Sequence, residues 1–431
     1  MKSFDISKIS NVYFIGIGGI GMSAIARMFF LEGKNVTGSD LAQSMVTGEL
    51  EKFGINIFYK QSSENISVDI DMVVYTPAIT EKNPELMRAR ELGIPTLSYP
   101  ETLGIISKEK YTIAVSGTHG KTTTTAMIAK VMIDAGLDPT VIVGSFLKDQ
   151  KSNFIAGKSK YLVVEACEYK RSFLNLHPNI LVITNIDEDH LDYYKDINDI
   201  QSAFREFALR LSKEDHVVCF PEDKNVGDVV SDLNCIVDKC SLDEFSKNIT
   251  LAGEHNKKNA QTVLAVSKIL GIDLSQALKS INSFAGTWRR FEYKGKTKNG
   301  SVVYDDYAHH PTEVRATLSM AREMFPDKKI HVVFQPHLYS RTKAHLDDFA
   351  QALSVASSVF VLPIYAAREA LDSSISSEML VEKMNSYNGG NAVFMNSKED
   401  VLTAVSDFGE KDVLITMGAG DVGVIAEQVV A

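Results

Sequence analysis

A glycine-rich loop between an apolar strand and a helix is the feature that most restricts the fold of this chain. The apolar, β-branched run 111–115 precedes the loop Ser116–Thr123 (Ser-Gly-Thr-His-Gly-Lys-Thr-Thr), and the segment 124–132 is typical of a helix. In such a strand–loop–helix unit, backbone N–H groups and the helix N-terminus point at phosphate groups. The loop therefore predicts an α/β domain that binds ATP.

Single residues of this loop have expected roles. Lys121 would neutralise the outer phosphates, and the Thr122 hydroxyl would bind Mg²⁺. The spacing departs from G-x-x-x-x-G-K-[ST], because Val115 stands five positions before Gly120. A glycine-rich turn without a ligand is the alternative, but Gly-Lys-Thr at the start of a helix favours ATP. The loop residues expected to bind ATP are Gly117, Thr118, His119, Gly120, Lys121, Thr122 and Thr123.

A second glycine-rich loop lies near the N-terminus. The strand-like run 12–15 leads into Gly16-Ile17-Gly18-Gly19-Ile20-Gly21, a helix is expected over 22–31, and a second strand over 35–38 ends at Ser39-Asp40. This is G-x-G-x-x-G in its usual setting, with an acid nearly twenty residues on that could meet a ribose. The pattern indicates a dinucleotide, although any pyrophosphate can sit on such a helix N-terminus. A tight turn without a ligand is the alternative.

Short apolar strands alternate with helix-period segments along all 431 residues. This alternation predicts parallel sheets flanked by helices, and the length suggests about three domains. The pattern breaks near 100–110 and again near 283–300. We therefore expect an α/β protein with a Rossmann-like domain at 1–108, a central P-loop ATPase-type parallel sheet at 109–288 and a Rossmann-like domain at 289–431.

Composition excludes several classes of protein. The net charge of −10 argues against a nucleic-acid partner, and no apolar run approaches the roughly 20 residues of a membrane span. The four cysteines form no C-x-x-C pair, so a structural zinc site is not expected. An acid at Asp5 argues against a signal peptide, and the predicted location is the cytoplasm.

Acidic and polar side chains follow several predicted strands. Glu165 ends the run 161–164, where an acid can hold Mg²⁺, and His190 follows the run 180–184 among three acids. Taken alone, His190 could be a solvated cap; beside a P-loop it becomes a candidate ligand. His255, Asn256 and Asn259 precede a helix, and they could cap it or hydrogen-bond an adenine.

The last third of the chain carries four polar clusters that adjoin strand-like runs. Because the carboxyl ends of parallel strands meet at one edge of a sheet, the four clusters together predict a ligand-facing rim. They are Arg289-Arg290-Phe291-Glu292, Asp305 through Pro311, Gln335 through Arg341, and Gly418-Ala419-Gly420-Asp421.

Taken in order, these motifs resemble the Mur ligases of peptidoglycan synthesis over essentially the whole chain, and the shortened P-loop is the form found in that family. The resemblance implies an ATP-dependent ligase that joins L-alanine to the lactyl carboxylate of UDP-N-acetylmuramate through an acyl phosphate, with Mg²⁺ as cofactor, acting as a monomer or homodimer. It rests on the two glycine loops, Asn185 through Asp192, His255 through Asn259, Arg290-Phe291-Glu292, Asp305 through Pro311, and Gly418 through Asp421.

The resemblance also implies the site residues. Lys121, Glu165, His190, Arg290 and His309 would be catalytic, and Thr122, Glu165 and His190 would hold the metal. Asn256, Asn259, Arg290 and Asp305 would join the loop in binding ATP. Tyr307, His309, His337 and Arg341 would hold the amino acid. The UDP-sugar would bind Gly16, Gly18, Gly19, Ile20, Gly21, Met22, Ser39 and Asp40.

Two positions depart from the family pattern. Where many members have Glu-Ala-Asp-Glu, this chain has Glu165-Ala166-Cys167-Glu168, so Cys167 replaces the aspartate. Where Gln-Pro-His-Arg is frequent, it has Gln335-Pro336-His337-Leu338, so Leu338 replaces the arginine. Arg341 must therefore act without that second arginine. Three alternatives stay open at this point. They are a recycling ligase that attaches a preformed peptide to the same UDP-sugar, an NAD-dependent dehydrogenase with an ATP-binding domain, and a non-catalytic nucleotide-sugar binder.

Overall fold

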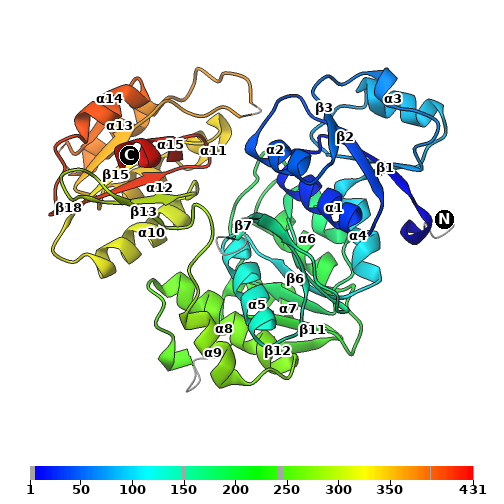
Figure 1. The fold of residues 1–431 in the computed structure, drawn as a ribbon. Coiled ribbons are helices and arrows are strands. Elements are labelled where there is room, and N and C mark those ends of the chain that lie inside the picture. The colour runs from blue at the N-terminus through cyan, green and yellow to red at the C-terminus, as the bar shows by residue number, and fades with distance from the viewer. Residues whose placement is uncertain (1–4, 148–151, 241–245, 368, 389, 431) are drawn as a thin grey trace. The chain divides into compact units, whose positions relative to one another are not determined.

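The computed structural model describes residues 5–147, 152–240, 246–367, 369–388 and 390–430. They form two compact units (Figure 1). The first comprises 1–186, 201–241 and 262–283 and contains two sheets, A and B; the second comprises 187–200, 242–261 and 284–431 and contains sheet C. The predicted fold class, α/β with three domains built on parallel sheets, is confirmed. The boundaries at 108/109 and 288/289 stay predictions.

Sheet A is a five-stranded parallel sheet in the order β3-β2-β1-β4-β5. Its central strand β1 (Asn11–Ile15) is almost wholly buried, as a strand covered on both faces should be. The other strands are β2 (Asn35–Ser39), β3 (Asn56–Phe58), β4 (Met72–Tyr75) and β5 (Thr96–Ser98). The helices are α1 (Ile20–Leu31), α2 (Met45–Lys52), α3 (Pro84–Glu91) and α4 (Tyr99–Lys108).

Local sequence explains where these helices begin. Ser44 and Ser98 form capping boxes at α2 and α4, and the Asn83 side chain accepts from two backbone N–H groups at the start of α3. Helix α1 differs, because its N-cap is Gly19 and no side chain caps it. The first N–H groups of α1 are therefore left to other acceptors.

Sheet B has seven strands in the order β12-β11-β10-β6-β9-β7-β8, all parallel except the last. Its strands are β6 (Tyr111–Ser116), β7 (Thr140–Leu147), β8 (Ser152–Ile155), β9 (Tyr161–Glu165), β10 (Ile180–Ile183), β11 (His216–Cys219) and β12 (Ile236–Lys239). The associated helices are α5 (Lys121–Asp134), α6 (Ile197–Ala208), α7 (Lys224–Val230), α8 (Glu254–Ile269) and α9 (Leu274–Asn282). Helix α5 begins at Lys121, earlier than the 124–132 expected, because Gly120 ends the loop in a left-handed conformation (φ 80°).

Sheet C has six strands in the order β13-β14-β18-β15-β16-β17, with only β13 antiparallel. Its strands are β13 (Glu292–Lys296), β14 (Val302–Asp306), β15 (Lys329–Phe334), β16 (Ser358–Val361), β17 (Ala392–Phe394) and β18 (Asp412–Met417). Its helices are α10 (Pro311–Met324), α11 (Tyr339–Ala344), α12 (Leu346–Leu353), α13 (Ser377–Asn388), α14 (Lys398–Ala404) and α15 (Gly423–Val430).

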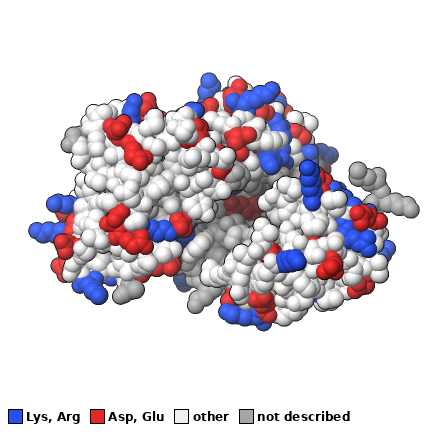
Figure 2. Space-filling view, turned by 90° about the horizontal axis from the view of Figure 1, so that it is seen from above, with Lys and Arg blue, Asp and Glu red and all other residues white. Residues whose placement is uncertain are grey.

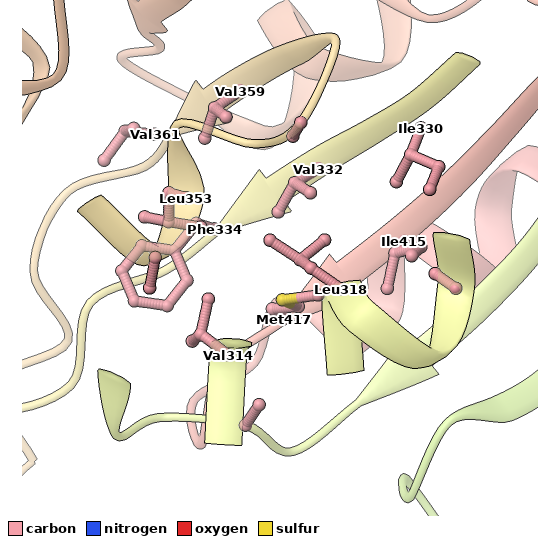
Figure 3. Packing of buried hydrophobic residues seen from close by; sticks show 14 of the residues in the cluster. Val314, Leu318, Ile330, Val332, Phe334, Leu353, Val359, Val361, Ile415 and Met417 are labelled. Atoms are coloured by element: carbon pink, nitrogen blue, oxygen red, sulfur yellow. The ribbon is translucent and has the colours of Figure 1, made fainter. Parts of the chain in front are cut away.

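One core cluster of this domain lies between sheet C and helices α10, α12 and α13, and a second lies on the other face of the sheet against α14 and α15. Figure 3 shows aliphatic side chains of β15, β16 and β18 packed against Val314 and Leu318 of α10 and Leu353 of α12. This packing fixes the carboxyl ends of the central strands, from which polar loops emerge.

On the face shown in Figure 2, Lys and Arg are interspersed with Asp and Glu, and neither charge forms a continuous patch. Among the described residues, no helix combines the length and the apolar character needed to cross a bilayer.

Candidate active site

The loop after β6 needs its glycines for steric reasons. Gly117 has φ 128°, and a Cβ added there would lie 2.0 Å from Thr184 Oγ1. Gly120 has φ 80° and is the N-cap of α5, with no side chain capping the helix. Both positions therefore favour glycine, and the close turn leaves the N-terminus of α5 open to an anion.

Asn185, after β10, braces this loop. Its side-chain oxygen accepts from His119 N (2.9 Å), its Nδ2 donates to His119 O (2.9 Å), and its backbone oxygen accepts from Thr118 N (3.1 Å). Asn185 was part of a predicted motif but had no assigned role. The structure gives it one, that of holding the loop of β6 to the end of the neighbouring strand.

Lys121 lies folded against the loop that precedes it. Its Nζ donates to Gly117 O (2.6 Å) and Thr118 O (3.0 Å) and pairs with Glu168 at 3.1 Å. Burial opposes the charged form, but Glu168, Cys167 and Glu165 together outweigh it and raise the pKa of Lys121. The ammonium therefore stays charged in a buried setting. Sequence reasoning gave Glu168 no role; only the fold brings it to Lys121.

Thr122 and Glu165 meet at the carboxyl edge of sheet B. Thr122 Oγ1 lies 3.1 and 3.0 Å from the two carboxylate oxygens of Glu165, and Gly144 N donates to Glu165 Oε2 at 2.8 Å. A Cβ on Gly144 would come within 2.8 Å of that carboxylate, so the close approach needs glycine. A hydroxyl and a carboxylate side by side are oxygen ligands of the kind that Mg²⁺ prefers.

The third expected metal ligand, His190, belongs to the segment 187–200 of the second unit, whereas Thr122 and Glu165 belong to the first. Asn256 and Asn259, on the first turns of α8, also belong to the second unit. Asn256 Nδ2 donates to Ala252 O (3.0 Å), and the Asn259 side chain is buried. Their expected roles at the metal and the adenine stay predictions.

The glycine loop after β1 is closed by Asp40. Gly16 has φ 79°, and Asp40 Oδ2 accepts from Gly18 N at 2.8 Å, while Ile20 and Met22 stand in the first turn of α1. Ser39 lies in the core, with its hydroxyl donating to the buried Glu85 (2.5 Å). Gly21 leaves room for the Tyr99 ring, which a Cβ would meet at 2.4 Å.

Helix α1 is also tied to the β7–β8 hairpin of sheet B. Arg27 Nη1 donates to Ser152 Oγ (2.7 Å) and Asn153 Oδ1 (3.2 Å), and the Asn153 amide donates to Ile20 O and Ser23 Oγ. Arg27 and Asn153 are buried, so these bonds are shielded from water. The glycine loop of sheet A is thereby positioned against the sheet that holds the P-loop.

Two adjacent arginines before β13 have different surroundings. Arg289 is buried: Nε donates to Asp305 (2.7 Å), while Nη1 and Nη2 donate to Gly420 O and Gly418 O, each at 2.8 Å. Arg290 is half-buried, 3.8 Å from Glu313. The carboxylate of Asp305, which is predicted to bind ATP, thus pairs with Arg289. Through its bonds to Asp305, Gly418 and Gly420, Arg289 connects three of the four polar clusters. Sequence reasoning gave Arg289 no separate role, because nothing in the pattern separates two neighbouring arginines.

The four residues expected to hold the amino acid lie together in the second unit. His309 Nδ1 is 2.9 Å from Tyr307 O, the His309 and His337 rings are 5.9 Å apart, and His337 Nδ1 accepts from Arg341 Nη1 at 3.1 Å. Burial lowers the pKa of His309, with Arg341 acting in the same direction against nearby carboxylates. His309 is therefore neutral at pH 7 and able to accept a proton.

Comparison with known proteins covers nearly the entire chain. Residues 11–111 match the model "Mur ligase family, catalytic domain", 115–273 match "Mur ligase middle domain", and 289–420 match "Mur ligase, glutamate ligase domain". The chain is 42% identical to a UDP-N-acetylmuramate–L-alanine ligase of Clostridium kluyveri over 454 aligned positions, which cover 99% of each chain. It is also 42% identical to the enzyme of that name from Agathobacter rectalis, again with 99% of each chain covered.

The fold of the chain also matches solved structures over nearly its full length. A UDP-N-acetylmuramate–alanine ligase from Thermotoga maritima superposes with a TM-score of 0.79 at 32% identity, covering 97% of this chain and 98% of that one. A murein peptide ligase from Psychrobacter arcticus has a TM-score of 0.70 at 21% identity, covering 98% and 100%, which establishes a shared fold alone.

Proposed function

The chain belongs to the Mur ligase family, and from this we infer that it joins L-alanine to UDP-N-acetylmuramate in an ATP-dependent reaction of peptidoglycan precursor synthesis. The observation that carries the inference is the end-to-end match to L-alanine ligases, 42% identical over 99% of the chain. The recycling ligase and the dehydrogenase are not favoured, because the similar full-length relatives named above are L-alanine ligases.

The chemistry explains why such a site needs positive charge. A carboxylate does not condense with an amine in water until one of its oxygens becomes part of a leaving group. ATP would transfer its γ-phosphoryl group to the lactyl carboxylate, giving ADP and an acyl phosphate. The amine of L-alanine then attacks the acyl carbon, and the tetrahedral intermediate loses phosphate to leave the amide. Two anions must approach each other in the first step, so fixed cations lower its barrier.

Lys121 and Arg290 are the cations of this chain that we assign to the phosphate groups. Lys121 supports the role because it is buried, charged and attached to the loop whose N–H groups open toward an anion. On binding ATP, its ammonium would exchange the loop carbonyls Gly117 O and Thr118 O for phosphate oxygens. Arg290 supports the role because its side chain is only half-buried.

Thr122 and Glu165, with His190, are the residues that would hold a divalent cation, which we propose to be Mg²⁺. The paired hydroxyl and carboxylate oxygens fit it. When bound, the cation supplies positive charge beside the phosphate oxygens. Glu165 is held for this role by Gly144 N.

The UDP pyrophosphate is assigned to Gly16, Gly18, Gly19 and the open N-terminus of α1, including Ile20, Gly21 and Met22. The uncapped Gly19 supports this assignment, because the first N–H groups of α1 need an acceptor. Asp40 borders the site through Gly18. Because the proposed substrates are ATP and a UDP-sugar, we propose the cytoplasm as the location of the reaction.

L-Alanine is assigned to Tyr307, His309, His337 and Arg341. Arg341 would bind the α-carboxylate, and His309 would take a proton from the ammonium to release the nucleophilic amine. The contact of His309 Nδ1 with Tyr307 O supports this role, because it leaves Nε2 as the ring nitrogen that can accept a proton.

Phosphate release tests the proposed function directly. Mg-ATP and UDP-N-acetylmuramate would be supplied with either L-alanine or the recycling tripeptide, and nicotinamide absorbance would be followed in parallel with NADH. We expect release that requires L-alanine and the UDP-sugar together. Release with the tripeptide alone would move the enzyme to recycling, and a change in nicotinamide absorbance would favour the dehydrogenase.

A further inference from the structure

A buried ion pair joins two segments of the second unit that lie far apart in the sequence. Asp189 Oδ1 accepts from Nε (3.3 Å) and Nη2 (2.8 Å) of Arg341, which lies on α11. The side chains are only 11% and 7% exposed. Two N–H groups of one guanidinium therefore converge on one carboxylate oxygen, which is the geometry of a charge-assisted ion pair.

The geometry of this contact leaves one edge of Arg341 available. A guanidinium carries five N–H bonds in one plane, and a carboxylate can bind the Nε–Nη2 edge or the Nη1–Nη2 edge. Asp189 occupies the Nε–Nη2 edge, and one Nη1 hydrogen goes to His337 Nδ1 at 3.1 Å. Among the described residues, the guanidinium makes no other hydrogen bond. Of the five N–H groups, one on Nη1 and one on Nη2 therefore have no acceptor among the described residues and can bind a second carboxylate.

A cleft of about 450 Å³ adjoins this pair. Its lining combines Arg341, Lys343 and His345 with the carboxylates of Asp189, Asp192 and Asp372 and with the apolar side chains of Leu338 and Ala344. Leu338, at the position where the family pattern often has arginine, is buried at the start of α11 and has φ 69°. The cleft therefore offers the N–H groups of Arg341 to a carboxylate and an apolar wall to a short aliphatic side chain.

The same carboxylate oxygen also fixes the backbone of the neighbouring residue. Asp189 Oδ1 accepts from His190 N at 2.7 Å, and His190 has φ 56°, in the left-handed region that few residues other than glycine adopt. One oxygen therefore restrains both Arg341 and the backbone of His190.

From these contacts we propose that Asp189 is a positioning residue for the amino-acid substrate, holding Arg341 by one edge so that its other edge binds the α-carboxylate. The inference rests on the proposed function, in which Arg341 receives L-alanine. It explains how a single arginine suffices beside Leu338. Asp189 supplies the rigidity that a second arginine would otherwise add, because a guanidinium already fixed in place loses little freedom when the substrate binds.

Asp189→Asn tests the proposal with little disturbance of the loop. An asparagine keeps an oxygen that can accept from His190 N, but it loses the charge that holds Arg341. We expect the KM for L-alanine to rise about tenfold, while kcat and the KM values for ATP and UDP-N-acetylmuramate change less than about twofold. Arg341→Lys should raise the same KM, and adding Asp189→Asn to it should raise it little further, because the two residues act through one contact.

Asp412→Asn is the matched control. Asp412 pairs with the buried His331 (3.0 Å) at the start of β18, the opposite edge of sheet C from the Gly418 loop. This variant should lower the melting temperature and leave the KM for L-alanine unchanged, as a purely structural pair would. An unchanged KM for L-alanine in an active Asp189→Asn enzyme would overturn the role of Asp189 alone. Wild-type enzyme that released no phosphate with L-alanine would instead overturn the proposed function, and this inference with it.

Discussion

Replacing Gly117 by alanine should cost far more than the loss of one flexible residue. A Cβ at this position would lie 2.0 Å from Thr184 Oγ1, whereas ordinary contacts begin at 3.4 Å. Thr184 and the loop would therefore have to move apart by about 1.4 Å, the difference between these two distances. The φ of 128° adds strain, since non-glycine residues forced into such regions cost about 1–3 kcal/mol.

The functional loss follows from the same displacement. Thr184 Oγ1 donates to His119 O (2.6 Å) and Ser116 O (3.2 Å), so moving it disturbs the loop that presents Lys121. Misplacing a catalytic group by about 1 Å can cost about 100-fold in rate. We expect Gly117→Ala to reduce ATP-dependent phosphate release by about 100-fold or more, and to lower the melting temperature by about 2–4 °C for each kcal/mol of strain.

Gly136→Ala separates steric contact from backbone strain. Gly136 follows α5 at its far end, has φ 75°, and has no atom within 4 Å of an added Cβ. Its replacement should cost about 1–2 kcal/mol, the typical price of a left-handed alanine, with activity unchanged. Differential scanning fluorimetry and a phosphate-release assay would measure both effects. Equal activity losses in the two variants, or full activity in Gly117→Ala, would refute the steric argument.

Three further outcomes are expected. Lys121→Ala should abolish phosphate release while UDP-N-acetylmuramate still binds in calorimetry; normal turnover would contradict the mechanism. Arg289→Ala should destabilise the protein by about 3–5 kcal/mol in thermal denaturation, because it leaves the buried Asp305 unpaired, whereas Arg290→Ala should reduce turnover with little loss of stability. Burial raises the pKa of Asp306 to about 6, above about 3.9 in the unfolded chain. The native state then binds the extra proton, so stability should fall by roughly 3 kcal/mol as pH rises from 4 through 6, and Asp306→Asn should flatten that part of the profile.

Much of the fold is predictable because strands and glycine loops are encoded locally. The runs at 111–115 and 161–164 correspond to β6 and β9. The meeting of Thr122 with Glu165 also follows from the rule that parallel strands end at one edge. These features need only the order of elements along the chain.

Other parts of the site depend on contacts that no local pattern encodes. Arg289 and Arg290 are adjacent in the sequence but differ in burial. The backbone is left-handed at Arg289 (φ 54°) and at Phe291 (φ 46°), and in this conformation Arg289 is buried while Arg290 is half-buried. The pairing of Asp189 with Arg341 spans 152 positions. Left-handed backbone at non-glycine residues and long-range ion pairs are products of the assembled fold, so sequence spacing cannot predict them.

Lys121 and Arg341 are each paired with a carboxylate for the same physical reason. A cation that must meet an anionic substrate in a dry site cannot stand alone in the ligand-free protein, because desolvation would favour its neutral form or its exposure to water. Lys121 is therefore held by Glu168, and Arg341 by Asp189. In each pair the carboxylate takes only part of the donor set: Lys121 also donates to two loop carbonyls, and Arg341 keeps one N–H on Nη1 and one on Nη2. Substrate can then bind while the first carboxylate stays in place, so the cation is oriented before the anion arrives and little reorganisation remains for the reaction itself.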